Sequence, residues 1–184
     1  VFTTIDSKLQ EAAQKSLKSN IEKYDIRHGY RGAEAKINYN ELLNSDFEYD
    51  LEVSKKNISK YLKSFYDINS NIPAVILNVD SKKIKVYSKD NQLLEINLNE
   101  ILIKSQYYDV NYKKRIKDFK SILSIGDVVR VKKVNKRWFL SQIPNVNGAL
   151  VSINSNSGAV SVLSGGYDFR ISKFNRVTQA KRQP

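Results

Sequence analysis

The hydrophobic pattern changes its period several times along the chain, and its first segment has the period of a helix. Ser7 and Gln10 have the spacing of a capping box, so a helix is expected to begin at Ser7. Gly29 is expected to end it. One apolar stripe follows spacings of four and three residues: Leu9, Ala13, Leu17, Ile21 and Tyr24. A stripe on an otherwise charged helix predicts packing against a partner surface.

The centre of the chain alternates apolar and polar residues, as half-buried strands do. Three such runs are separated by short polar segments: 74–79, 83–87 and 93–98. They predict a three-stranded meander. Residues 128–134 and 137–143 flank Asn135-Lys136, and this pair predicts a hairpin.

A basic segment with helical spacing precedes that hairpin. Its predicted apolar stripe is Tyr112, Ile116, Phe119 and Leu123. Five short strands with a helix before the last pair are the elements of an OB-type barrel, a small sheet that closes and leaves few unpaired edges. Other small five-stranded barrels fit the same pattern.

The segments that precede the meander are less regular. Residues 33–50 mix short alternating runs with acidic residues and are predicted to form strand and loop. A short helix is expected next. Its buried side is predicted to be Ile58, Tyr61, Leu62 and Phe65, and its wet side Lys55, Lys56, Lys60 and Lys63.

After Pro144 a second hairpin is predicted, with strands at 149–153 and 159–163. Two strands alone are marginally stable, so we expect this hairpin to pack on the stripe of the first helix, with residues 1–5 as a third strand. The fold class is therefore mainly β with α: a five-stranded OB-like barrel plus a partial α/β flank made of the N-terminal helix and the second hairpin. The predicted boundaries are 1–45, 46–145 and 146–184.

The composition restricts the chemistry. The chain has no cysteine, which excludes disulfides and thiolate sites, and one histidine, His28, which leaves no histidine metal cluster. His28 is predicted to be a solvated loop residue, and no cofactor or metal is expected. Asp46, Glu48 and Asp50 could imitate the carboxylate pair of glycoside chemistry, but on an irregular surface segment they are predicted to be solvated.

The net charge of +12 predicts attraction to an anionic partner: nucleic acid, a phospholipid surface, an acidic polymer or an acidic protein face. The candidate docking surface consists of basic residues: Lys113, Lys114, Arg115, Lys117, Lys120, Lys132, Lys133, Lys136 and Arg137. A solvated charged face is the competing interpretation. A single-stranded nucleic-acid-binding OB protein is the alternative function, with Tyr87 or Trp138 as stacking residues. Trp138, beside Phe139 and Leu140, is expected in the core instead.

Both ends of the chain resemble class A penicillin-binding proteins. The N-terminal matches are Thr3-Thr4-Ile5-Asp6, Leu9-Gln10 and Ala13, and the C-terminal ones are Gly148 to Ile153, Gly158, Gly165 to Phe169, Ser172, Phe174 to Arg176, Thr178 to Ala180 and Arg182 to Pro184. His28 to Gly32 and Gln142 to Pro144 resemble the type 1a subgroup. These matches cover both flanks, whereas the middle of the chain matches only in pattern.

The resemblance implies that the flanks are transpeptidase-domain segments, that an OB-like domain is inserted between them, and that the chain is an interior fragment ending at Pro184 just before the Ser-x-x-Lys motif. It implies a parent that is a peptidoglycan glycosyltransferase and D-Ala-D-Ala transpeptidase at the periplasmic face of the inner membrane, anchored outside this fragment. The fragment itself contains no Ser-x-x-Lys and no Lys-Thr-Gly, so no catalysis is expected from it. Ser152-Ile153-Asn154 is interpreted as a chance match to Ser-x-Asn. The implied partners are the rest of the synthase and an outer-membrane lipoprotein activator or peptidoglycan, with no nucleic acid.

Overall fold

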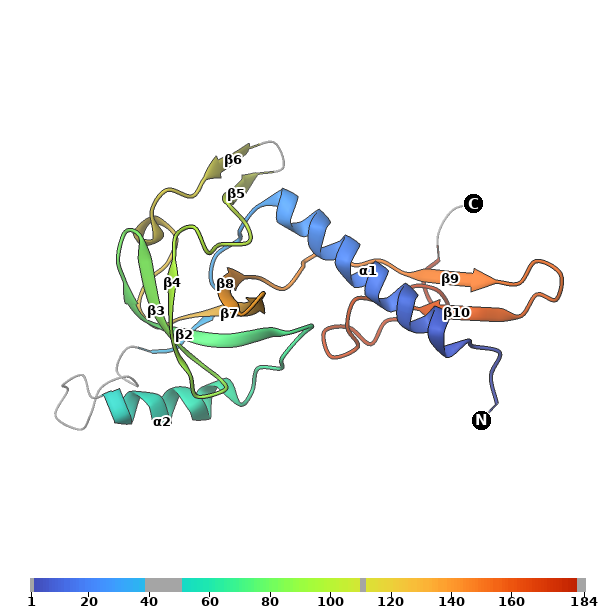
Figure 1. The fold of residues 1–184 in the computed structure, drawn as a ribbon, viewed down its shortest axis with the longest axis horizontal. Coiled ribbons are helices and arrows are strands. Elements are labelled where there is room, and N and C mark those ends of the chain that lie inside the picture. Colours follow the sequence, from blue (N-terminus) through green and yellow to red (C-terminus); the bar gives the residue numbers. More distant parts are fainter. Residues whose placement is uncertain (1, 39–50, 110–111, 182–184) are drawn as a thin grey trace. The chain divides into compact units, whose positions relative to one another are not determined.

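The structure is a computed structural model that describes residues 2–38, 51–109 and 112–181, and the chain divides into two compact units (Figure 1). Unit 1 comprises Val1–Asp25 and Pro144–Pro184, and unit 2 comprises Ile26–Ile143. The domain boundaries predicted from the sequence, after residues 45 and 145, stay a prediction. The fold is mixed, with two α-helices and mostly antiparallel sheet among the described residues.

Unit 2 is built on a six-stranded antiparallel sheet. Its strands are β1 (Ala35–Lys36), β2 (Asn71–Val79), β3 (Lys83–Ser88), β4 (Leu93–Asn97), β7 (Asp127–Val134) and β8 (Arg137–Ser141). The order is β1-β7-β2-β3-β4, and β8 also pairs with β7. The predicted meander and the predicted hairpin around Asn135-Lys136 are therefore confirmed.

Alternation along β2 divides the core of unit 2 into two clusters on opposite faces of the sheet. Ala74 and Ile76 belong to the larger cluster, whereas Val75 and Leu77 belong to the smaller one. Helix α2 (Leu51–Leu62) supplies the smaller cluster with two buried residues, Ile58 and Leu62, and Tyr61 and Phe65 pack beside them. The predicted buried side of this helix is confirmed.

The chain just beyond β4 returns to β8. The amide of Leu140 donates to the Glu100 carbonyl (2.9 Å), and the amide of Leu102 donates to the Leu140 carbonyl (3.0 Å). Ile101 and Leu140 form an isolated parallel bridge. These bonds connect the chain after β4 to β8 at one point, and a fully closed barrel stays a prediction.

The predicted helix at Tyr112 to Leu123 is wrong. This segment forms β6 (Tyr112–Arg115), which pairs with β5 (Ser105–Asp109), and then the short 3-10 helix η2 (Phe119–Ser121). Asp118 caps η2 by accepting from the Lys120 amide, and the Phe119 amide donates to the Ser81 carbonyl. Ile116 and Phe119 thus bond to distant backbone, and the Leu123 amide makes one i to i−4 bond, to the Phe119 carbonyl (2.9 Å).

Unit 1 contains most of α1 (Ser7–His28) and the hairpin of β9 (Leu150–Ile153) and β10 (Val160–Ser164), as predicted. The cap is Asp6, whose Oδ1 accepts from the Leu9 amide at 2.9 Å, so the predicted Ser7 capping box is wrong. The side chain of Gln10 instead bonds the backbone of Leu163 twice, donating to its carbonyl (3.0 Å) and accepting from its amide (2.9 Å).

Two further expectations for unit 1 need correction. Residues 2–5 form no strand, although the Thr4 hydroxyl donates to the Val160 carbonyl at 2.6 Å. The predicted stripe is only partly covered, since Ile21 is buried but Leu9 and Tyr24 are 52% and 42% exposed. His28, predicted in a loop, is the last residue of α1.

Candidate functional site

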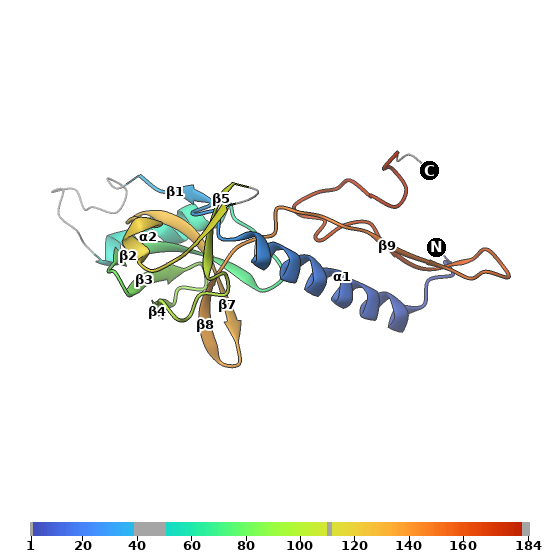
Figure 2. The same ribbon diagram turned by 90° about the horizontal axis from the view of Figure 1, so that it is seen from above.

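The nine basic residues predicted to form a docking surface lie on two hairpins of unit 2. Lys113, Lys114, Arg115, Lys117 and Lys120 lie in or just after the β5–β6 hairpin, and Lys132, Lys133, Lys136 and Arg137 lie at the end of the β7–β8 hairpin. Figures 1 and 2 both place the β5–β6 hairpin and the end of the β7–β8 hairpin on separate parts of unit 2. They are therefore two surfaces and are treated separately below.

The end of the β7–β8 hairpin projects away from the sheet (Figure 2). Its two turn residues, Asn135 and Lys136, both have positive φ angles, 48° and 67°, as a tight two-residue turn requires. Lys133 lies opposite Trp138 in the register, and its Nζ is 5.7 Å from the centroid of the indole ring. This distance allows a cation–π contact that orders both side chains.

The β5–β6 surface has a different character. Lys114, Arg115, Lys117 and Lys120 are exposed, but Asp118 lies among them and caps η2. Lys82 donates to the Lys117 carbonyl at 3.0 Å, which adds another cation. Opposite charges are thus mixed with the cations here.

The two aromatic residues proposed to stack on nucleic-acid bases do not present freely accessible ring faces. Tyr87 is buried in the smaller cluster. Trp138 is half-buried, packs against the larger cluster and has Lys133 over its ring. The expectation of a core role for Trp138 is confirmed in part.

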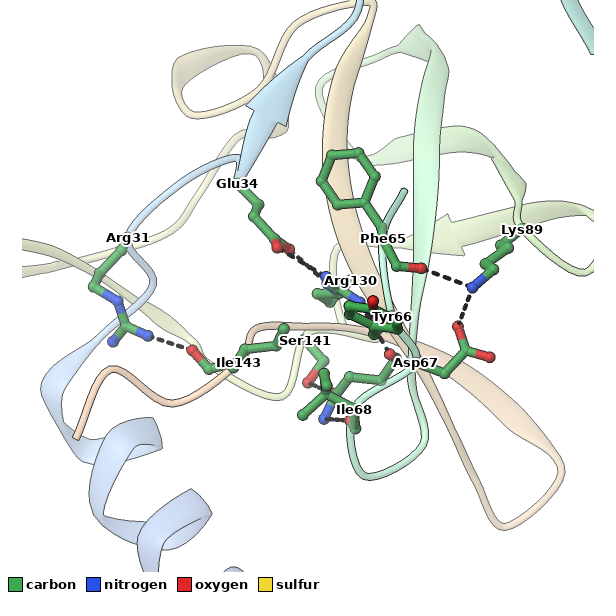
Figure 3. Close-up of polar contacts among 11 residues, drawn as sticks. Arg31, Glu34, Phe65, Tyr66, Asp67, Ile68, Lys89, Arg130, Ser141 and Ile143 are labelled. Atoms are coloured by element: carbon green, nitrogen blue, oxygen red, sulfur yellow. Dashed lines mark hydrogen bonds and ion pairs between the residues drawn. The ribbon is translucent and has the colours of Figure 1, made fainter. Parts of the chain in front are cut away.

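An ion pair between the buried Arg130 and the more exposed Glu34 anchors the entry to unit 2, and sequence reasoning missed it (Figure 3). The guanidinium of Arg130 on β7 donates to both carboxylate oxygens of Glu34, with Nη2 to Oε1 at 2.8 Å. Its Nη1 donates to the carbonyls of Tyr66 (2.6 Å) and Asn71 (3.3 Å). Glu34 and Arg130 are distant in sequence, so no local spacing could have indicated the pair.

The two ends of the unit 2 segment are bonded to each other. The Arg31 amide donates to Gln142 Oε1 (3.0 Å), and Gln142 Nε2 donates to the Gly29 carbonyl (3.0 Å). Arg31 Nη2 donates to the Ile143 carbonyl at 2.8 Å (Figure 3). The incoming and outgoing chains are therefore held side by side.

The bonds of Gly29 and Arg31 with Gln142 and Ile143 form a clamp at the base of unit 2. Tyr30, between Gly29 and Arg31 in the sequence, is a core residue and not an acid–base group. Burial, with the Asp127 carboxylate as a smaller cause, raises the pKa of Tyr30 well above its ordinary value. The phenol therefore stays protonated at any physiological pH. Its ring belongs to the larger cluster.

The Ser-x-Asn match lies in the β9–β10 hairpin, and the acidic cluster lies outside the described residues. Asn154 of Ser152-Ile153-Asn154 is a turn residue, and its Oδ1 accepts from the amides of Asn156 (2.9 Å) and Ser157 (3.0 Å). Asp46, Glu48 and Asp50 lie outside the described residues. Within the described ranges, no group of three or more potential metal ligands occurs.

The curled antiparallel sheet with its helix and basic hairpins is the framework of an OB-like module, and the family comparison agrees. The family model described as the penicillin-binding protein OB-like domain matches residues 30–146, so the chain belongs to this family. Its whole length is similar to penicillin-binding protein 1A of Escherichia coli strain K12, at 33% identity over 184 residues. The identity to penicillin-binding protein 1A of Neisseria meningitidis is 36% over the same length.

A solved structure supports the same relationship. The crystal structure of penicillin-binding protein 1A from Haemophilus influenzae matches 97% of this chain with a TM-score of 0.69 and 29% identity, and the match covers 24% of that chain. The predicted resemblance to class A penicillin-binding proteins of type 1a is thus confirmed. The chain spans about a fifth of the length of the curated relatives, 21% for the first two.

Homology to penicillin-binding protein 1A implies a protein of the cell envelope. In the part of the chain that the structure describes, neither α-helix combines the length and the apolar character that a bilayer crossing needs.

Proposed function

We propose that this chain is the non-catalytic accessory region of a bifunctional peptidoglycan synthase. Its OB-like unit spaces the glycosyltransferase and transpeptidase domains and docks a regulator. The family match at residues 30–146 supports this role. The observation that carries it is the bonding of both ends of unit 2 to each other through Gly29, Arg31, Gln142 and Ile143.

An inserted module needs this arrangement for a physical reason. The host domain can fold around the insertion only if the chain leaves the module close to where it enters. Hydrogen bonds between the entering and the leaving segment fix the distance between them. The module must also fold around its own core. Unit 2 has two core clusters of its own, so a partner that binds it meets a formed surface.

The basic hairpins of unit 2 are the surfaces on which we place docking. The partner is an outer-membrane lipoprotein activator or peptidoglycan itself, and the location is the periplasmic face of the inner membrane, with the anchor elsewhere in the synthase. Positive surface charge increases the association rate with anionic partners. The charge of +12 favours such partners.

The test uses the full synthase that contains this chain. Residues 32–141 are replaced by a short Gly-Ser linker, and labelling by fluorescent penicillin is compared with peptidoglycan cross-linking, each with and without a detergent extract of the cell envelope. We expect the extract to stimulate cross-linking by the intact synthase, because it contains the regulator. In the variant we expect labelling by fluorescent penicillin to persist and this stimulation of cross-linking to disappear. Unchanged stimulation would contradict the docking role, and stable labelling of the isolated 184-residue chain would contradict its non-catalytic role.

A further inference from the structure

We propose that the projecting end of the β7–β8 hairpin binds an acidic face of another protein through Lys133, Lys136 and Arg137. This inference rests on the proposed docking role of unit 2 and assigns it a surface and a class of partner. It separates these residues from the β5–β6 surface.

Charge distribution is the first observation. The segment from Val128 to Ile143 contains no acidic residue. Some other cations of unit 2 have carboxylate partners: Lys83 with Glu95 (3.2 Å), Lys89 with Asp67 (3.5 Å) and Arg130 with Glu34. Within the described ranges, no ion pair involves Lys133, Lys136 or Arg137. Their field is therefore directed to solvent, where a partner's carboxylates can meet it.

Rigidity is the second observation. The base of the hairpin is fixed because β7 is buried from Asp127 to Val131 between β2 and its other neighbours. At the tip, the two positive-φ turn residues give a tight turn that matches the twist of the strands, and Lys133 lies over the ring of Trp138. A preorganised surface loses less conformational entropy on binding than a flexible one.

The shape and chemistry of the tip favour protein over the other anionic partners. Attachment to a bilayer strengthens with the apolar area that is buried in it, whereas this turn consists of the polar residues Asn135 and Lys136. Single-stranded nucleic acid needs open aromatic rings, and Trp138 is packed against the core under Lys133. Arginine beside a tryptophan is a composition enriched at the energetic centres of protein interfaces.

Two charge-reversed variants of the full chain test the surface. The first is Lys133→Glu, Lys136→Glu and Arg137→Glu. The matched control is Lys114→Glu, Arg115→Glu and Lys117→Glu, which changes the net charge by the same amount. The probe is fluorescent poly-L-glutamate, which presents carboxylates as an acidic protein face does. We expect the first variant to weaken binding by about tenfold or more and the control by less than about threefold at moderate salt.

Folding is checked with the fluorescence of Trp138, the only tryptophan, and with a second variant, Lys136→Glu with Arg137→Glu, that keeps the Lys133 contact. An equal loss in both charge-matched triple variants would overturn the proposal, because net charge alone would then explain binding. Tighter binding to phosphatidylglycerol vesicles or to an oligothymidine than to polyglutamate would overturn the partner class.

The two proposals fail in different ways. If the hairpin variants bind polyglutamate normally while replacement of residues 32–141 in the synthase still abolishes stimulation, the docking role stands and this surface is wrong. If that replacement leaves stimulation unchanged, the docking role itself is wrong.

Discussion

The hairpins β7–β8 and β9–β10 have similar local sequence signals but very different surroundings. Strand β7 pairs with β2 as well as β8, and its residues from Asp127 to Val131 are buried. Among the strands that the structure describes, β9 and β10 pair only with each other, and Val151 and Ile153 on β9 are 44% and 57% exposed. Alternating sequence thus specifies a hairpin in both units, while burial depends on the neighbours that the rest of the unit supplies.

Unit 1 compensates partly with polar bonds from α1 and the segment before it. Thr4, Asp6 and Gln10 bond successive backbone groups of β10. Such bonds each contribute about 1 kcal/mol, less than the burial of a large apolar side chain. We therefore expect unit 2 to be the more stable unit, and each prediction below contrasts the two.

The largest expected contrast is between two phenylalanines. Phe119 in unit 2 is fully buried, so Phe119→Ala should cost about 3–5 kcal/mol through lost burial and a cavity. Phe169 in unit 1 is 69% exposed, and Phe169→Ala should change stability by about 0.5 kcal/mol or less. Urea unfolding followed by Trp138 fluorescence reports unit 2, and hydrogen exchange with mass spectrometry reports each unit. Similar effects of both substitutions would contradict the contrast.

The next contrast concerns ion pairs. Glu34→Ala leaves the guanidinium of Arg130, whose side chain is 4% exposed, without its carboxylate. We expect a loss of about 2–3 kcal/mol, less than for a fully buried pair because Glu34 itself reaches solvent. Glu95→Ala, which removes an exposed pair with Lys83, should cost less than about 1 kcal/mol. Urea unfolding of both variants measures the difference, and equal losses would show that burial of Arg130 has little effect.

The same contrast explains which features the sequence could predict. Periodicity found α2, the meander and both hairpins, because these depend on the local spacing of apolar residues, helical in α2 and alternating in the strands. It failed at Ile116, Phe119 and Leu123, which have helical spacing and are all buried. Ile116 lies just after β6, Phe119 in the 3-10 helix η2 and Leu123 in a loop. Their burial is set by contacts with distant chain, such as Ile116 with Lys104 and Phe119 with Ser81.

The docking surface was predicted as one set of cations because charge can be counted along a sequence, whereas position in space cannot. Residues 113–120 and 132–137 are close in sequence but lie on two hairpins (Figure 1). The clamp between Arg31 and Gln142 joins residues 111 positions apart, and its amide and guanidinium chemistry has no local pattern. The residue types of such contacts are visible in the sequence, but their pairing requires the fold.

A smaller contrast is expected between two glycines with positive φ. A Cβ at Gly126 in unit 2 (φ 85°) would lie 2.9 Å from the carbonyl oxygen of Ile37, whereas a Cβ at Gly158 in the β9–β10 turn (φ 71°) would meet nothing within 4 Å. In both alanine variants the left-handed backbone conformation should cost about 1–2 kcal/mol of stability. Only Gly126→Ala must also move backbone, so we expect it to be the more destabilising in hydrogen-exchange measurements. The opposite order would mean that the backbone at Ile37, just after β1, moves away from the new Cβ at little cost in stability.

The smallest expected effect is a pH dependence in unit 1. The hydrogen bond from the Arg170 side chain, aided by its charge and backbone amide, holds the pKa of Asp168 below its ordinary value despite partial burial. A carboxyl whose pKa is lower in the folded state stabilises fully above its unfolded pKa, about 3.9, and loses that contribution as pH falls through the folded pKa. We expect less than about 1 kcal/mol, because Arg170 is half exposed. An NMR titration of the Arg170 amide, which donates to Asp168 Oδ1 at 2.9 Å, should report that lowered pKa, and Asp168→Asn should abolish the transition. A midpoint at or above the ordinary aspartate value would show that this bond is too weak to order the chain after β10.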